Sequence, residues 1–297
     1  MPMWSITLYM GNDGMKVLVT GYNGQLGFDV VKAGLSQGLE MVGVGIDDLD
    51  ITDEQAVHTS VRRIRPDAIV HCAAYTAVDK AEDDVDLCRR VNVDGTRYLA
   101  EAAKTINAKM MYISTDYVYD GQGLELYKET DTPQPIGQYG LTKYEGELAL
   151  QSILENWYII RISWVFGING NNFIKTMLRL AESRSELNVV SDQYGSPTYT
   201  ADLAKLIIDM IQTEQFGIYH ATNEGICSWA EFAEEIFRQA GKDVKVNHIS
   251  TEEYPTRAVR PKNSRMSKDK LEGCGFQRLP FWQDALKRYL EELNAKG

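Results

Sequence analysis

The chain has 297 residues, of which 44% are hydrophobic, so it is long enough for one large domain or two modest ones with a substantial core. Its formal net charge of −11 argues against nucleic-acid binding, which needs a basic face to neutralise phosphates. No run approaches the roughly 18–20 apolar residues of a membrane span, and the start of the chain lacks the features of a secretory signal. We therefore expect a cytoplasmic protein with neither a nucleic-acid nor a membrane partner.

Residues 1–14 precede a second methionine, Met15, and the first predicted strand follows at once. We interpret them as an N-terminal extension or a disordered arm, outside the fold. The four cysteines of the chain are widely scattered, with neither C-x-x-C spacing nor the density of a disulfide scaffold. We expect them to be reduced, buried thiols.

A glycine-rich turn joins the first predicted strand, Lys16–Thr20, to a helix that starts at Gln25. Its glycines, Gly21, Gly24 and Gly27, follow the pattern G-x-x-G-x-x-G. The first permits a tight turn, the second lets a pyrophosphate approach the backbone, and the third lets the helix pack closely on the sheet. The phosphates would lie over the helix N-terminus. We interpret the turn as a dinucleotide-binding site, with a purely structural turn as the alternative.

Strand and helix patterns continue to alternate through the first half of the chain. Further strands are predicted over 40–46, 68–72, 109–114 and 158–163, and helices over 53–64, 84–106 and around 139–143. Repeated strand-helix units indicate an α/β protein with a doubly wound parallel sheet of the Rossmann type. Such sheets bind ligands at the carboxyl ends of their strands, where the glycine turn, Cys72–Thr76, Ser114–Asp116 and Ser163–Trp164 all fall.

Tyr139 and Lys143 are four residues apart in a predicted helix, so their side chains share one face, one turn apart. A cation within roughly 4–6 Å lowers the pKa of a phenol from its ordinary value of about 10. We therefore expect Lys143 to make Tyr139 a proton donor or acceptor near neutral pH. Taken alone, the pair is a weak signal, because it is more often a half-buried aromatic residue beside a solvated lysine.

From about residue 171 the pattern changes to helices separated by short strands and by loops rich in Gly, Pro and Tyr. We expect a NAD(P)-binding Rossmann domain over residues 15–170 and a smaller C-terminal substrate-binding lobe over 171–297. The boundary is approximate, and the chain is free to cross back over it.

Together these residues resemble the extended short-chain dehydrogenases/reductases and, within them, the dTDP-4-dehydrorhamnose reductase family. The resemblance extends from Lys16 to about Leu293. The segments that carry it are Gly21–Gly27, Leu49–Asp53, Ala73–Glu82, Val91–Thr96, Ser114–Tyr119, Tyr139–Lys143, Arg161–Gly167, Asn171–Phe173 and Arg260–Ser264. It implies an NAD(P)H-dependent oxidoreductase that reduces the 4-keto group of dTDP-4-dehydro-L-rhamnose to dTDP-L-rhamnose, for rhamnose polysaccharide biosynthesis.

The resemblance also implies the catalytic residues, which are Thr115, Tyr139 and Lys143. Ketone reduction needs a hydride donor, a proton for the developing alkoxide and a hydrogen bond to the carbonyl oxygen. Tyr139 would supply the proton, Lys143 would keep the phenol acidic and reach the nicotinamide ribose, and Thr115 would donate to the carbonyl. A strand-end hydroxyl that satisfies a turn is the plainer interpretation of Thr115.

The remaining site residues are also assigned by resemblance. The expected cofactor-binding residues are Gly21, Asn23, Gly24, Gln25, Leu26, Gly27, Asp50, Ile51, Ala73, Ala74, Thr76, Tyr139 and Lys143. The expected substrate-binding residues are Thr115, Asp116, Trp164, Gln193, Tyr194 and Arg260. Trp164 could equally be a core aromatic residue. A small-molecule nucleotide sugar is the expected partner, and a homodimer is possible.

Cofactor choice rests on the end of the second predicted strand. Related folds place there an acid for the adenosine ribose or a basic residue for a 2′-phosphate. Here those positions are Gly45 and Ile46, followed by Asp47 and Asp48. These two positions thus offer neither an acid that repels a 2′-phosphate nor a basic residue that pairs with it. We favour NADPH, with NADH possible, because the family often accepts both cofactors. Mg²⁺ is possible by family resemblance only; no ligand spacing indicates a metal.

Two other functions remain open from the sequence. One is a non-catalytic relative, such as the regulatory subunit of methionine adenosyltransferase, which keeps the nucleotide fold to bind a partner protein. The intact set of Thr115, Tyr139 and Lys143 favours an enzyme over it. The other is a sugar-nucleotide epimerase or dehydratase. Because Asp116 follows Thr115 directly, an acid is available to abstract a sugar proton, and the sequence does not decide between the reactions.

Overall fold

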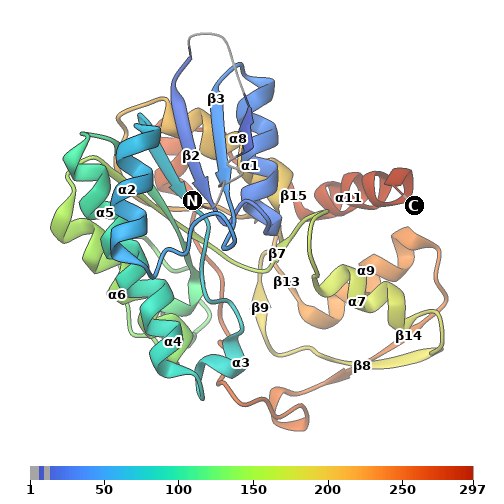
Figure 1. The fold of residues 1–297 in the computed structure, drawn as a ribbon. Coiled ribbons are helices and arrows are strands. Elements are labelled where there is room, and N and C mark those ends of the chain that lie inside the picture. The colour runs from blue at the N-terminus through green and yellow to red at the C-terminus, as the bar shows by residue number, and fades with distance from the viewer. Residues whose placement is uncertain (1–6, 10–13, 297) are drawn as a thin grey trace.

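The computed structural model describes residues 7–9 and 14–296. Its centre is a seven-stranded sheet with six parallel strands (Figure 1). The order across the sheet is β1-β3-β2-β4-β5-β6-β11, in which β2 is Lys16–Thr20, β3 Glu40–Val44, β4 Ala68–His71, β5 Lys109–Thr115, β6 Trp157–Ile162 and β11 Gly217–His220. The reversal of strand order beside β2 creates the crevice where doubly wound sheets bind ligands. The predicted α/β class and sheet type are confirmed.

The edge strand β1, Thr7–Tyr9, pairs antiparallel with β3. The expectation that residues 1–14 lie entirely outside the fold is therefore wrong for these three residues. The main-chain groups of β3 explain the difference, because β3 would otherwise be the open edge of the sheet and accepts any extended segment as a further strand. The rest of the predicted arm, apart from Gly14, lies outside the described residues.

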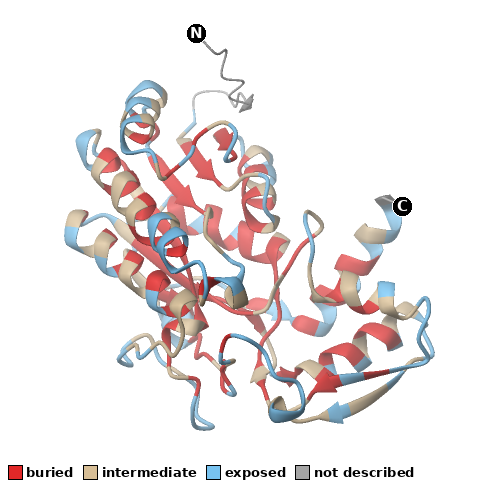
Figure 2. Cartoon of the chain, turned by 60° about the horizontal axis from the view of Figure 1, so that its bottom comes forward, coloured by how far each residue is buried: buried red, intermediate tan, exposed pale blue. Residues whose placement is uncertain are grey.

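Helices cover both faces of the sheet. One face packs against α1 (Gln25–Ser36), α8 (Thr200–Ile211) and α10 (Asp269–Gly273), and the other against α2 (Glu54–Ile64), α5 (Gly95–Thr105) and α6 (Gln138–Ile153). The central strands are buried on both sides, which matches their continuous apolar sequence, and Figure 2 shows this buried layer through the middle of the molecule. Among the described residues, no helix is long and apolar enough to cross a membrane.

The long helix predicted over 84–106 is one helical stretch with a widened turn in its middle. It consists of α4 (Val85–Arg89), a π-helical turn over Arg90–Asp94, and α5. Such π-turns occur frequently at functional sites. Here the turn contains Asn92, which is buried and bonded to residues of the site described below.

A smaller lobe lies beside the carboxyl edge of the sheet, with its own apolar core. Its helices are α7 (Phe173–Leu180), α9 (Trp229–Ala240) and α11 (Trp282–Lys296). Its strands form four two-stranded sheets, which are β7 (Val165–Phe166) with β10 (Thr198–Tyr199), β8 (Glu186–Val190) with β14 (Lys245–Ile249), β9 (Tyr194–Gly195) with β13 (Cys227–Ser228), and β12 (Asn223–Glu224) with β15 (Leu279–Phe281). The chain crosses back to the larger domain after residue 171, because β11 is a strand of the large sheet and α8 and α10 pack on one of its faces.

Candidate active site

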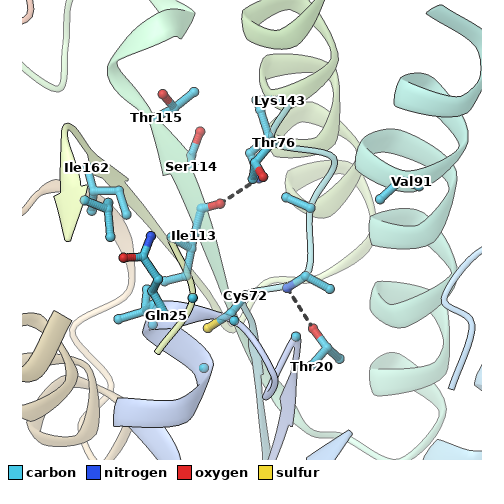
Figure 3. A pocket seen from close by; sticks show the side chains of 18 of the residues that line it. Thr20, Gln25, Cys72, Thr76, Val91, Ile113, Ser114, Thr115, Lys143 and Ile162 are labelled. Atoms are coloured by element: carbon cyan, nitrogen blue, oxygen red, sulfur yellow. Dashed lines mark hydrogen bonds between the residues drawn. The ribbon is translucent and has the colours of Figure 1, made fainter. Parts of the chain in front are cut away.

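A cavity of about 630 Å³ opens along the carboxyl ends of the parallel strands (Figure 3). It begins at the glycine turn, passes the end of β3 and the loop after β4, and reaches the end of β5 and the N-terminal half of α6. Most residues predicted for the cofactor and the chemistry line it, namely Gly21, Gly24, Gln25, Leu26, Gly27, Asp50, Ile51, Ala73, Ala74, Thr76, Thr115, Asp116, Tyr139, Lys143 and Trp164. One continuous cavity therefore joins the glycine turn to the Tyr–Lys pair.

Four predicted site residues lie outside this lining. The side chain of Asn23 packs against Gly45, behind the glycine turn. Gln193 is buried and donates to Thr251, and the Tyr194 ring lies under the guanidinium of Arg265. Arg260 donates to Asp79 and, at 3.3 Å, to the hydroxyl of Tyr117.

Arg260 is nevertheless connected to the cavity, because Tyr117 lines it. Arg260 thus lies at the rim of the cavity and contacts a lining residue, Tyr117. Gln193 and Tyr194 belong to the smaller lobe and do not line the cavity.

The glycine turn has the geometry that close backbone packing requires. Gly21 has φ +68°, and a Cβ there would lie 2.7 Å from the amide nitrogen of Ala73. A Cβ at Gly27 would lie 2.4 Å from the main-chain oxygen of Gly21, so this glycine serves the contact between helix and turn. A Cβ at Gly24 would meet only that oxygen, at 3.1 Å, and would otherwise point into open space. Gly24 is therefore the glycine whose missing side chain leaves room for a ligand.

The second strand of the Rossmann unit, β3, ends directly before Gly45 and Ile46, the positions on which the expected cofactor choice depends. β3 stops at Val44, and Gly45 and Ile46 follow in the cavity wall, with Ile46 77% exposed. Asp48 turns back and accepts a 2.9 Å hydrogen bond from the amide of Gly45. Neither Asp47 nor Asp48 lines the cavity.

The ammonium group of Lys143 does not interact with Tyr139 in the way that the spacing predicts. It donates a 2.7 Å hydrogen bond to the main-chain oxygen of Ile113 (Figure 3). It also lies 4.0 Å from the centre of the Tyr112 ring. Burial lowers the pKa of Lys143 to about 7, while the carboxylate of Glu147 acts in the opposite direction. The lysine is thus held at the floor of the cavity, against the strand.

Tyr139 correspondingly has no lowered pKa. Burial raises its pKa above the ordinary value, and the neighbouring Asp116 carboxylate raises it further, while a hydrogen bond with Thr115 lowers it. The expected acidifying effect of Lys143 is wrong for the protein without ligands, because desolvation of the phenolate outweighs any cation nearby. Tyr139 therefore stays protonated at neutral pH, which suits a proton donor.

Thr115 connects the phenol to a buried acid. Its hydroxyl donates to Asp116 Oδ1 at 2.9 Å, and Asp116 Oδ2 accepts a 2.5 Å hydrogen bond from Ser264. Burial raises the pKa of Asp116 to about 6, although the hydrogen bonds from Ser264 and Thr115 lower it. Tyr139, Thr115, Asp116 and Ser264 thus form a row of hydrogen-bonding groups along the end of β5.

Buried polar residues that the motif argument did not assign hold this arrangement in place. Asn92 in the π-turn donates to Thr142 at 3.1 Å and accepts from the amide of Tyr75, so it ties α6 to the loop after β4. Arg161 and Glu147 form a fully buried ion pair, and Ser114 donates to the same carboxylate. Their sequence signal was present, since Asn92, Ser114 and Arg161 belong to segments that carry the family resemblance.

The cavity has further lining residues that were not assigned to the cofactor or the substrate. They lie at strand ends and in adjoining loops, and include Thr20, Val44, Leu49, Thr52, Cys72, Val78, Val91, Ile113, Ser114, Tyr117, Ile162, Ser163, Val165, Gly170 and Asn171. Some of them, such as Cys72, Ser114 and Ser163, belong to segments expected at this edge of the sheet, whereas Val44 and Ile162 have the apolar character of ordinary core positions.

One group of described residues brings possible metal ligands together. Glu54 and His58 on α2 and Glu101 on α5 place their ligand atoms within 4.8 Å of one another. None of the three lines the cavity. His58 and Glu101 also form an ion pair, with 3.8 Å between Nε2 and Oε2, which accounts for their proximity without a metal.

The fold and the cavity together define a class of protein. A doubly wound sheet, a glycine turn at one end of the cavity and a Tyr–Lys pair on one helix at the other are the arrangement of the extended short-chain dehydrogenases/reductases. The family model described as RmlD substrate binding domain matches residues 15–295, and the chain belongs to that family.

Comparisons with individual proteins agree with this assignment. The chain is 41% identical to the spore coat polysaccharide biosynthesis protein SpsK of Bacillus subtilis, over 93% of this chain and 97% of that protein. It is 42% identical to the dTDP-4-dehydrorhamnose reductase of Aggregatibacter actinomycetemcomitans, over 92% of this chain and 97% of that protein. The crystal structure of the Bacillus anthracis dTDP-4-dehydrorhamnose reductase in complex with NADP has a TM-score of 0.92 and 43% identity, covering 94% of this chain and 99% of that one.

Proposed function

We propose that this protein is an NAD(P)H-dependent reductase that converts the 4-keto group of dTDP-4-dehydro-L-rhamnose into the hydroxyl group of dTDP-L-rhamnose. The observation that carries the proposal is the single cavity that runs from the glycine turn to Thr115, Tyr139 and Lys143. The names of relatives that are 41–42% identical to this chain indicate the substrate class. The name of SpsK adds a role in polysaccharide biosynthesis.

The residues fit a dinucleotide. The open side of Gly24 would take the pyrophosphate, at the N-terminus of α1. Asp50 and Ile51 would flank the adenosine half, and Ala73, Thr76 and Lys143 would contact the nicotinamide half. When bound, the nicotinamide ring supplies the hydride that reduces the carbonyl carbon.

The chain's own residues supply the proton. Tyr139 is partly buried and is protonated at neutral pH, so its hydroxyl can donate to the carbonyl oxygen and transfer its proton as negative charge develops there. Thr115 is hydrogen bonded to the phenol and orients it. Lys143 places a cation at the cavity floor, where it would favour the phenolate that remains after the transfer.

Three further properties are part of the proposal: the preferred cofactor, a metal requirement and the oligomeric state. We infer a modest preference for NADPH, because no carboxylate in the cavity wall at Gly45 and Ile46 repels a 2′-phosphate. A dependence on Mg²⁺ and a homodimeric state are implied by the family resemblance. Activity after dialysis against a chelator tests the first, and the mass of the native protein in solution tests the second.

The deciding experiment measures NADPH and NADH oxidation against a panel of nucleotide-linked 4-keto sugars, with product analysis. We expect one equivalent of NADPH consumed per dTDP-L-rhamnose formed from dTDP-4-dehydro-L-rhamnose. An epimerase or dehydratase would transform its sugar without net cofactor consumption, and a non-catalytic relative would bind NADPH and convert none of the panel. Either result would contradict the proposal.

A further inference from the structure

Trp164 is held in a backbone conformation that its side chain does not favour. Its φ is +50°, in the left-handed region where a bulky residue is rare. It lies between β6 and β7, directly before β7, and lines the cavity. A residue in such a conformation persists only when its surroundings fix it, and such residues gather at ligand sites. The neighbours that fix Trp164 are therefore of functional interest.

Two residues of the smaller lobe lie against the indole of Trp164, and we call them the indole seat. Trp229, the first residue of α9, stacks on it, with ring centroids 3.7 Å apart and an angle of 14° between the planes. Gly195 in β9 approaches so closely that a Cβ there would lie 2.9 Å from Trp164 Cε2. β9 pairs with β13, directly before α9, so both parts of the seat come from one small sheet.

The seat is itself fixed within the lobe. The ring of Phe173 lies 4.7 Å from that of Trp229 between centroids, and Ser228 and Glu231 form a capping box around the first turn of α9. The capping box sets where α9 begins and therefore where Trp229 stands. Neither Gly195 nor Trp229 lines the cavity, so they act on a bound molecule through the residues they contact. Trp164 is the contact that they share, and a Cβ at Gly195 would also lie 3.1 Å from Ser264 Cβ.

We propose that Gly195 and Trp229 are positioning residues that hold Trp164 at the sugar end of the cavity and thereby set the affinity for the nucleotide sugar. This rests on the proposed function, together with the expectation from the sequence that Trp164 binds the nucleotide sugar. Gly195 supplies the space that the indole occupies, and Trp229 supplies the flat face against which it rests. The dinucleotide end, more than one strand away at β2 and β3, does not involve the seat.

The kinetic test uses Gly195→Ala, Trp229→Leu and the conservative Trp229→Phe. Because small displacements of a positioning group cost large factors in binding, we expect KM for the nucleotide sugar to rise on the order of tenfold in the first two variants. The phenyl ring of Trp229→Phe keeps part of the stacking face and should restore much of the affinity. The Kd for NADPH, measured by fluorescence titration, and kcat should change little.

Two matched controls separate this effect from general damage. Gly273→Ala adds the same methyl group where nothing lies within 4 Å. Trp282→Phe also removes an indole, from the core of the same lobe. The ring of Trp282 packs against that of Phe232, with 5.4 Å between the centroids, and not against Trp164. We expect both controls to keep the wild-type KM, and thermal melting of every variant shows whether the fold is retained.

Circular dichroism supplies a readout that a merely structural role would not move. Stacked indoles couple and give a characteristic far-ultraviolet couplet, which Trp229→Phe must abolish. Gly195→Ala retains both indoles, so a reduced couplet in that variant reports the displacement of Trp164 itself.

Each outcome decides the proposal. A reduced couplet with an unchanged KM would overturn it, because Trp164 would have moved without consequence for the substrate. An unchanged couplet and KM in Gly195→Ala would also overturn it. If the wild-type protein converts no nucleotide sugar at all, the proposed function fails first, and the substrate role of the seat fails with it.

Discussion

The ammonium group of Lys143 lies 2.7 Å from the main-chain oxygen of Ile113, in the floor of the cavity. Burial holds the pKa of this lysine near 7 in the folded chain, against 10.5 for an ordinary lysine. Between these two values the unfolded chain binds more protons than the folded chain, so stability rises with pH from about 7 to about 10.5. Below pH 7 the lysine is charged in both states, so the folded state bears the full free-energy cost of burying the cation. The site thus trades stability for a cation in the floor of the cavity.

We therefore predict that Lys143→Met abolishes turnover and weakens NADPH binding while raising the melting temperature of the ligand-free protein at pH 6. The gain should shrink as the pH rises above about 7, where the folded chain loses the buried charge, and should disappear above about 10.5, where the wild-type lysine is neutral in both states. Scanning calorimetry at several pH values measures it. Lys104→Met, at an exposed position on α5, is the matched control and should leave the melting temperature unchanged. A lower melting temperature for Lys143→Met at pH 6 would mean that the ammonium is net stabilising.

Tyr139→Phe should remove most turnover and leave NADPH affinity nearly intact, because it deletes the proton donor and keeps the ring. General acid catalysis contributes about 10²–10⁴-fold, which sets the expected loss in kcat. Steady-state kinetics and a fluorescence titration check the two parts. Tyr144→Phe, one residue beyond Lys143 on the same helix and outside the cavity lining, is the control. Activity within a few-fold of wild type in Tyr139→Phe would remove Tyr139 from the mechanism.

The glycine turn separates a binding effect from a folding effect. Gly24→Val should abolish NADPH binding in a folded protein, because its side chain would enter the space open to a ligand. Gly27→Val should lower the melting temperature as well, because its Cβ would lie 2.4 Å from the oxygen of Gly21. Calorimetric titration and thermal melts distinguish the two variants. Micromolar NADPH binding by Gly24→Val would show that the turn is structural.

Much of the fold was predictable because its signals are local. Apolar strands, helical periodicity and the glycine spacing identified β2, α1, β3, α2, β4 and β5 in order, and parallel topology follows from their alternation. The pairing of Thr7–Tyr9 with β3 and the return of β11 to the sheet were not predictable, because both depend on which open edge the distant segment meets.

The site was predictable to the extent that its residues follow strand ends. Thr115, Tyr139 and Lys143 come together in the cavity for that reason. The direction of the Lys143 ammonium and the raised pKa of Tyr139 could not be inferred from spacing, because both depend on how deeply the pair is buried. The stack of Trp229 on Trp164 joins residues that are far apart in the chain and has no sequence signature.

Cofactor choice gives the last prediction. Because β3 ends at Val44 and the amide of Gly45 engages Asp48, the cavity wall at Gly45 and Ile46 has neither a repelling carboxylate nor a cationic partner for a 2′-phosphate. We expect wild-type kcat/KM values for NADPH and NADH to differ by less than about a hundredfold, or roughly 2.8 kcal/mol. Ile46 is 77% exposed at the cavity rim, so Ile46→Arg should shift the preference toward NADPH by adding a charge-assisted contact.

Ile46→Glu should shift the preference toward NADH, since a carboxylate there repels a 2′-phosphate and can accept from ribose hydroxyls. Leu124→Arg, at another exposed position outside the cavity lining, adds the same charge elsewhere and should change neither value. Initial rates with both cofactors at a fixed nucleotide-sugar concentration measure all four proteins. Rejection of NADPH by more than a hundredfold in the wild type would contradict the prediction, because it would require Asp47 or Asp48 to turn into the ribose position when cofactor binds.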